Sequence, residues 1–284
     1  MAMLLVVAAA IAWSIFDIQR KLLAARIQPL VLAIALAAAV TPVYGVLLLG
    51  NKPELPASGY WLPALASLLV SSLAAVGFIQ AVKVGRIALL IPVLSISPIV
   101  AALVSYVFFS EPLSVLQWLS MLVIVFAIFL LNGGWSFNLG PGTGLMVLVA
   151  CGWGSGLVFD KLALQYASPL FHGLIQSLGM FLLLSAVFVL GKRRLPLLQE
   201  AVLFRQQGRS FLFSVLAFLV AVICQLYALQ FLHPGLVETI KRAVGMLGAV
   251  LWGVWLFDER PRPWQLALIL LMIICIAQLL LIPS

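Results

Sequence analysis

Two stretches of this chain, AWSIFDIQRKLL at residues 12–23 and GWGSGLVFDKLAL at residues 152–164, carry the same pattern. In each, a tryptophan near the start is followed eight residues later by a lysine, and a proline lies eight residues after that lysine, beyond the end of the quoted stretch. Three matching pairs share an offset of 140 positions: Trp13 and Trp153, Lys21 and Lys161, and Pro29 and Pro169. Because the chain has 284 residues, an offset near half its length indicates that the second half is a divergent copy of the first.

The duplication continues toward the end of each half. At an offset of 148, the matches are Ser97, Ala101, Ser105, Phe109 and Glu111 with Gly245, Ala249, Gly253, Phe257 and Glu259. The larger offset indicates insertions in the second copy, mostly within the basic stretch 192–209. Internal duplication in a hydrophobic chain is typical of transporters, whose substrate site lies near the bilayer midplane between the repeats.

The composition predicts an all-α integral membrane protein. Hydrophobic residues make up 65% of the chain and charged residues 8%, and the mean hydropathy is +1.24. A helix needs about 20 mostly apolar residues to cross a bilayer, and these runs lack the polar alternation of membrane barrel strands. Ten transmembrane helices are predicted, at 3–23, 29–50, 61–81, 87–109, 114–132, 143–163, 168–191, 210–231, 235–257 and 263–282.

An odd number of helices in each copy fixes the relation between the two copies. With five helices each, repeats 1–132 and 143–284 must enter the membrane from opposite sides, as inverted repeats. The three cysteines, Cys151, Cys224 and Cys275, fall inside predicted helices without metal-ligand spacing. We therefore expect no disulfide, metal or other cofactor.

The duplicated segments resemble the EamA family of the drug/metabolite transporter superfamily. The resemblance rests on AWSIFDIQRKLL and GWGSGLVFDKLAL, and on YVFFSEP (106–112) and VWLFDERP (254–261), and it covers essentially the whole chain. It implies a transporter fold, with substrates ranging from amino acids, nucleosides and sugars to choline-like and drug-like compounds. The chain departs from the common family pattern at Lys241 and Arg242, which lie inside the ninth predicted helix.

That ninth helix carries the main candidate substrate site, because charge inside hydrocarbon is costly and marks function by default. Glu238 lies three and four residues before Lys241 and Arg242, so it can pair with either along one helix face. One interpretation is a Glu238–Arg242 brace, with Lys241 reaching toward the headgroups. The other places Lys241 or Arg242 in a central cavity, where it neutralises a carboxylate or phosphate.

Other polar and aromatic residues at membrane depth complete the predicted site. Gln80 aligns with Tyr227 between the repeats, and Gln225 aligns with Phe78. Such pairs suit either a cavity wall or interhelical hydrogen bonds. The predicted wall consists of Trp13, Gln80, Trp153, Gln225 and Tyr227, since both tryptophans lie too deep for the interfacial aromatic belt.

The remaining charged and special residues are given structural roles. Asp17 is expected to pair with Lys21, and Asp160 with Lys161, near helix ends. Glu111 and Glu259 are expected to cap the helices that follow them. The small residues expected at helix contacts are Ser97, Ala101, Ser105, Gly245, Ala249 and Gly253. Pro92 and Pro98 are expected to kink the fourth helix.

The function predicted from these features is secondary transport of a small polar or anionic metabolite by alternating access. An alternative is a flippase for a phosphate-bearing lipid-linked substrate, and a third is a non-transporting polytopic protein. No catalytic constellation or nucleotide loop is present, so we expect neither an enzyme nor an ATP-driven pump.

Partners and orientation follow from the charge pattern. The net charge of +8 is spread over loops, which suits an anionic leaflet rather than nucleic acid. We expect an integral, multi-pass protein of the plasma (inner) membrane, with the lipid bilayer and a small-molecule substrate as partners. Connectors rich in Lys and Arg, including 192–209, favour both termini outside, whereas the family resemblance implies both inside.

Overall fold

The computed structural model describes residues 2–51, 55–109, 114–131, 140–191, 204–258 and 261–281. Within these residues the structure is helical, and no strand occurs among them. The first half holds α1 (Ala2–Ala24), α2 (Pro29–Gly50), the 3-10 turn η1 (Ser58–Tyr60), α3 (Trp61–Val84), α4 (Ile87–Val93), α5 (Ile96–Phe109) and α6 (Val115–Leu131). The second half holds α7 (Thr143–Ala163), α8 (Pro169–Leu190), α10 (Gly208–Leu229), α11 (Pro234–Phe257) and α12 (Pro263–Leu281).

The helices follow the apolar segments of the sequence closely, with ends that differ from the predicted ones by at most three residues. Proline opens α2, α8, α11 and α12, because its fixed φ suits the first helical turn and its missing N–H is not needed there. Eight helical segments of the described chain are long and apolar enough to cross a membrane, and Pro263–Cys275 is a shorter apolar helix. The protein is therefore a multi-pass membrane protein.

The fourth predicted helix is broken rather than continuous. It forms α4 and α5, separated by a turn at Leu94 and Ser95. Pro92 and Pro98 flank this turn, and neither can donate the backbone hydrogen bond that a continuous helix requires there. The kink predicted from the two prolines is confirmed.

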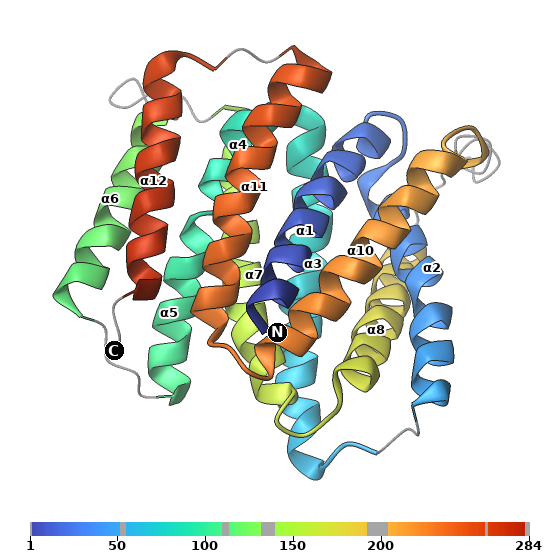
Figure 1. The fold of residues 1–284 in the computed structure, drawn as a ribbon. Helices are drawn as coiled ribbons and strands as arrows, with labels where there is room; N and C mark the ends of the chain where they lie inside the picture. Colours follow the sequence, from blue (N-terminus) through green and yellow to red (C-terminus); the bar gives the residue numbers. More distant parts are fainter. Residues whose placement is uncertain are drawn as a thin grey trace.

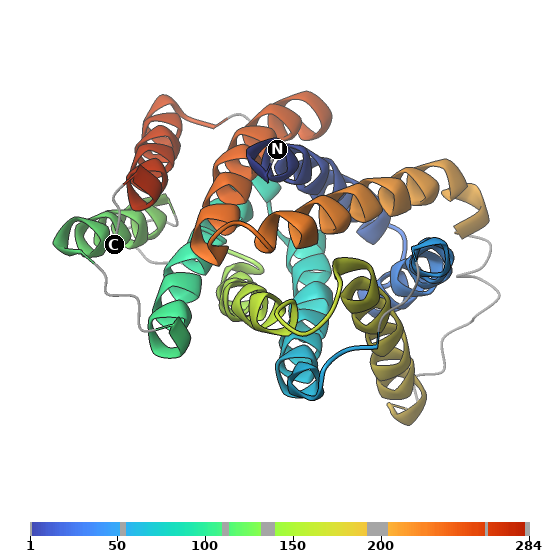
Figure 2. The ribbon, with the colours of Figure 1, turned by 60° about the horizontal axis from the view of Figure 1, so that its bottom comes forward.

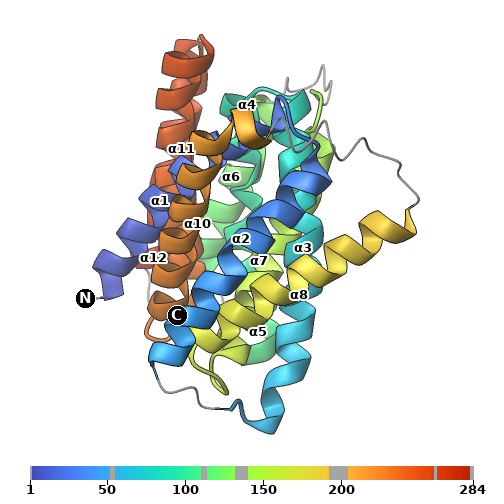
Figure 3. The same ribbon diagram turned by 90° about the vertical axis from the view of Figure 1, so that its right-hand side faces the viewer.

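Helices from the two halves pack against one another throughout the molecule. α3 contacts α7, α1 contacts α10 and α11, and α5 contacts α7. α2 and α8 cross on one face in Figure 3, while α6 and α12 lie together at the left edge of Figure 1. Seen from below, α3 lies between α7 and α8 (Figure 2). The two halves thus form one interleaved bundle.

The direction of the chain also differs between the halves. In Figure 1, α1 runs upward from the N-terminus, whereas α7 runs downward and turns into α8 toward the lower end of the molecule. The first turn of α1 and the last turn of α12 lie toward the same lower side. The expected caps Glu111 and Glu259, and residues 192–203 of the basic connector, lie outside the described residues.

Candidate functional site

A large cavity lies among helices of both halves. Its empty volume is about 1160 Å³, including the part open to solvent, and its walls come from α1, α2, α3, α7, α8, α10 and α11. Most of the wall is apolar or aromatic, with charged and hydroxyl-bearing side chains at a few points. Such a composition is typical of small-molecule sites, where a few polar groups orient a ligand held by apolar surface.

Three charged residues of α11 form a buried cluster at the cavity. Lys241 Nζ lies 2.8 Å from Glu238 Oε2, and Arg242 Nε lies 2.9 Å from Glu238 Oε1. The Ser97 hydroxyl of α5 donates a hydrogen bond to the same carboxylate. Glu238 is 0% exposed, against 6% for Lys241 and 5% for Arg242. The carboxylate therefore lies behind the two cations, which themselves line the cavity.

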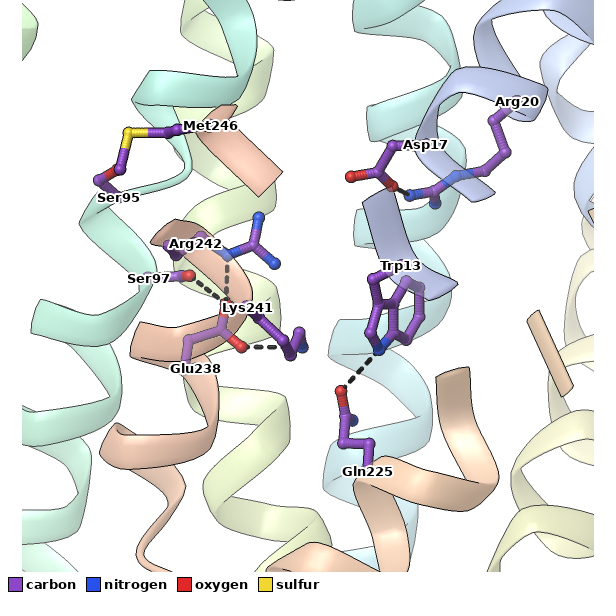
Figure 4. Close-up of polar contacts among 10 residues, drawn as sticks. All are labelled: Trp13, Asp17, Arg20, Ser95, Ser97, Gln225, Glu238, Lys241, Arg242 and Met246. Atoms are coloured by element: carbon purple, nitrogen blue, oxygen red, sulfur yellow. Dashed lines mark hydrogen bonds and ion pairs between the residues drawn. The ribbon is translucent and has the colours of Figure 1, made fainter. Parts of the chain in front are cut away.

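A second ion pair faces this cluster from α1. Arg20 pairs with Asp17, and both line the cavity although Arg20 is only 2% exposed. The guanidinium carbon of Arg20 lies 3.8 Å from the centroid of the Phe78 ring, 4.4 Å from that of Phe16 and 5.2 Å from that of Trp153. Stacking on aromatic faces stabilises a desolvated cation. Figure 4 shows the two charged groups on opposite sides of the same space.

Taken together, the two groups carry an excess of positive charge. In this part of the wall the cations Arg20, Lys241 and Arg242 are paired with two carboxylates, those of Asp17 and Glu238. This part of the wall therefore carries a local excess of one positive charge. An anion entering the cavity would offset it, and the guanidinium groups can hold a planar carboxylate or a phosphate through two hydrogen bonds.

Tryptophans from the two repeats meet between the charged groups. The ring centroids of Trp13 and Trp153 lie 6.4 Å apart. Trp13 Nε1 donates a 2.9 Å hydrogen bond to Gln225 Oε1 of α10 (Figure 4). Lys241 Nζ lies 5.0 Å from the centroid of the Trp13 ring, and Arg242 Cζ lies 6.0 Å from that of Trp153. The duplicated tryptophans thus form an aromatic wall against which both cations rest.

A separate polar cluster, made of Tyr60, Ser67, Asp160 and His172, lies in another part of the wall. His172 Nε2 lies 3.0 Å from Asp160 Oδ1, and His172 Nδ1 lies 3.1 Å from the Tyr60 hydroxyl. The Ser67 hydroxyl donates to the same oxygen of Asp160. Ser67, Asp160 and His172 line the cavity. We call this group the Asp160–His172 cluster.

Comparison with known proteins places the chain in a family. The model of the EamA-like transporter family matches residues 1–133 and 140–281, one match for each half. This chain belongs to the EamA-like transporter family. It is therefore a membrane transporter of the drug/metabolite transporter type, as the sequence resemblance predicted.

The fold of this EamA-like protein also occurs among solved structures, 22 chains of which match it significantly. One of them, described only as "Crystal structure of protein", is 16% identical, with a TM-score of 0.67 over 99% of this chain and 96% of its own length. At this identity the likeness concerns the fold alone. No curated protein matches significantly.

The structure gathers most of the predicted site residues of the transporter around one space. Trp13, Trp153, Gln225, Lys241 and Arg242 line the cavity. Glu238 lies directly behind Lys241 and Arg242 as their shared counter-ion. The Glu238–Arg242 ion pair of the first interpretation and the cavity position of both cations occur together. Lys241, however, is buried and pairs with Glu238, so its predicted reach toward the headgroups is wrong.

Two predicted wall residues lie elsewhere. Gln80 is exposed on the outside of α3, and Tyr227 is half-buried against the apolar core formed by α1, α2, α8 and α10. Neither lines the cavity, which differs from the prediction. Alignment of the repeats gives depth along a helix, but it does not indicate which face of the helix turns inward.

The predicted ion pairs near the helix ends also differ from the structure. Asp17 pairs with Arg20 rather than with Lys21. Asp160 contacts Ser67 and His172, while Lys161 Nζ donates to the carbonyl oxygens of Leu229 and Leu232, at 2.5 and 3.2 Å. Arg20 and His172 also line the cavity, although neither is among the predicted site residues. The signal for Arg20 was available, since it is a charge inside an apolar helix.

Proposed function

We propose that this protein is a secondary transporter that binds a small anionic metabolite in its central cavity and moves it by alternating access. The observation that carries the proposal is the arrangement of three buried cations against two carboxylates at the cavity wall. The local excess of one positive charge favours an anion at this part of the wall, because Arg and Lys form charge-assisted hydrogen bonds with carboxylates and phosphates. The aromatic wall formed by Trp13 and Trp153 gives the same substrate apolar contact.

We further propose that the ten predicted helices cross the membrane as two inverted five-helix repeats. The packing supports this, because its contacts occur in equivalent pairs. α1, the first helix of the first half, contacts α10 and α11 of the second half. In the same way α7, the first helix of the second half, contacts α3 and α5, which are the equivalent helices of the first half. α2–α8 and α6–α12 each join equivalent helices. A two-fold relation between halves that run in opposite directions is the arrangement that permits rocking between inward-open and outward-open states.

The membrane in question is proposed to be the plasma (inner) membrane, with the basic connectors in the cytoplasm. Arg205, just before α10, and Arg209, in its first turn, are both exposed, and the positive-inside rule favours the cytoplasmic side for such basic residues. This orientation places both termini outside.

The proposed anion preference can be tested with ligand pairs that differ in charge but hardly in shape. Methanesulfonate and dimethyl sulfone form one such pair, and acetate and acetamide form another. Ligands that bind only the folded state raise its stability, so the anions should raise the melting temperature of the purified protein while the neutral partners leave it unchanged. Anions that stabilise should then exchange across proteoliposomes. Equal stabilisation by both members of each pair would exclude the proposed anion site.

A further inference from the structure

The Asp160–His172 cluster has no part in the cationic site, yet it lies in the same cavity. His172 is 0% exposed and Asp160 retains slight exposure. Its members come from η1, α3, α7 and α8, so the cluster ties elements of both halves together. A histidine buried in contact with a carboxylate, at the wall of a transport cavity, is well placed to take up a proton, because histidine is the side chain that changes charge near neutral pH.

The hydrogen bonds of the cluster can be satisfied with and without an added proton. With a neutral imidazole, Nε2–H donates to Asp160 and the Tyr60 hydroxyl donates to Nδ1. When a proton is added at Nδ1, that nitrogen becomes a donor and the Tyr60 oxygen accepts, with the hydroxyl hydrogen turned aside. Proton uptake therefore reverses one hydrogen bond and leaves no ring nitrogen unpaired.

The charged and titratable groups around the cluster come from every neighbouring element. η1 contributes Tyr60, α2 contributes Tyr44 beside Gly173, and α7 contributes Asp160. The described part of α10 contributes only uncharged side chains to the wall: Phe218, Val222, Gln225 and Leu226. Across the cavity lie Asp17 and Arg20 of α1, and Lys241 and Arg242 of α11 with Glu238 behind them.

Counting these groups gives a balanced cavity. The cations are Arg20, Lys241 and Arg242; the carboxylates are Asp17, Glu238 and Asp160. With His172 neutral, the described residues of the empty cavity carry no net charge together. An entering monoanion gives them and the anion a net charge of −1, and uncompensated charge at buried side chains is unfavourable. A proton on His172 restores the balance.

We propose that the Asp160–His172 cluster is a proton-binding site, and that an anion bound at Arg20, Lys241 and Arg242 draws a proton to it. The inference rests on the proposed anion transport and names its coupling ion. The proton comes from the aqueous side, binds His172 Nδ1 and is held by the Asp160 carboxylate. By reciprocal linkage, lower pH strengthens anion binding by the same factor by which the anion strengthens proton binding.

The proton site can be tested without any ligand. The chain has only two histidines, His172 and His233, so ¹⁵N-histidine NMR in lipid nanodiscs gives two sets of signals, which the variant His172→Gln assigns. A neutral and a protonated form of His172 should both be observed between pH 9 and pH 5. Asp160→Asn should reduce the protonated fraction of His172 at a given pH, because the opposite charge is lost. A His172 signal that stays unchanged over this range would refute the proton site.

The coupling is tested separately with methanesulfonate, whose charge is constant over this range. Its addition should increase the protonated fraction of His172 at a given pH, and its stabilisation of the wild type should be greater at pH 5.5 than at pH 8.5. In His172→Gln, methanesulfonate should still stabilise, but equally at both pH values. If methanesulfonate stabilises the wild type equally at both pH values, the proposed coupling between anion and proton is wrong, while the anion site is supported. If it stabilises at neither pH, the proposed function fails, while the titration alone decides the proton site.

Discussion

At the scale of single residues, the charged cluster of α11 is held together by one carboxylate, that of Glu238. Glu238 is fully buried and is the shared partner of Lys241 and Arg242, with Ser97 donating a third contact. The two cations differ from Glu238 in position, since they line the cavity and it does not. Replacing Glu238 should therefore mainly reduce stability, whereas replacing Lys241 or Arg242 should mainly reduce anion binding.

Glu238→Gln should lower the free energy of unfolding by about 3–5 kcal/mol, because it leaves two buried cations without their carboxylate. Lys241→Met and Arg242→Met each remove one cation and leave Glu238 paired with the other, so both should fold. Both should lose stabilisation by methanesulfonate. Thermal unfolding with and without the anion measures the two effects on the same samples.

The prediction fails if both methionine variants respond to methanesulfonate as the wild type does. It fails equally if their response falls only in proportion to the folded protein that remains. Either result would make Lys241 and Arg242 a structural brace around Glu238, rather than groups that contact the substrate.

The partners of individual charges could be predicted only in part from the sequence. Helical spacing allows Asp17 to pair with residue 20 or residue 21, since both lie near its face of the helix. Arg20 is selected by aromatic rings from other elements, Phe78 of α3 and Trp153 of α7, which stack on its guanidinium. Contacts of this kind depend on tertiary packing that no single segment encodes. The depth of Lys241, by contrast, could be predicted because its helix begins at a proline.

At the scale of helices, the close packing of α7 against α5 depends on a glycine at the contact. A Cβ at Gly154 of α7 would lie 2.5 Å from the carbonyl oxygen of Ser97 and 2.9 Å from Cβ of Val100, both in α5. Neither atom belongs to the flexible end of a side chain. Ser97 also donates to Glu238, so the contact between α5 and α7 helps to position the charged cluster.

Gly154→Ala should therefore force α5 and α7 apart and lower the free energy of unfolding by about 1–3 kcal/mol. Gly144→Ala in the same helix is the matched control, because a Cβ there meets no atom within 4 Å. The control should be neutral or stabilising by up to about 1 kcal/mol, since alanine favours the helix over glycine. Thermal unfolding measures the stability of both variants, and equal changes in the two would contradict a tight contact at Gly154.

Most helices could be predicted because hydropathy alone sets their existence and length. The break between α4 and α5 could be predicted as well, since Pro92 and Pro98 remove backbone donors. The inward face of α3 is marked by Ser67, Ser71 and Ser72, which line the cavity, whereas Gln80 gave a misleading signal because it is exposed. His172 looked isolated in sequence, because its partners Asp160 and Tyr60 are 12 and 112 residues away.

At the scale of the whole molecule, the two ends of the bundle should face different compartments. Gln206 lies before α10 and Ser58 lies in η1, and these elements occupy opposite ends in Figure 3. Both residues are exposed. The bias of Lys and Arg places the Gln206 end in the cytoplasm.

Single cysteines at these positions should report this orientation in a variant without Cys151, Cys224 and Cys275. In intact cells, a membrane-impermeant thiol reagent should label Ser58→Cys and should reach Gln206→Cys only after permeabilisation. The reverse pattern would show that both termini lie inside, as the family resemblance implied. Labelling of both positions after permeabilisation serves as the control for reactivity.

The balanced charges of the cavity also bear on what can drive this carrier. Membrane voltage does work only on charge that moves, about 2.3 kcal/mol for each elementary charge per 100 mV. An empty cavity without net charge and a cavity that holds one anion and one proton carry the same net charge, which is zero. Both halves of the cycle would then be electroneutral. A pH difference across the membrane could concentrate the substrate, while voltage alone would leave its distribution unchanged.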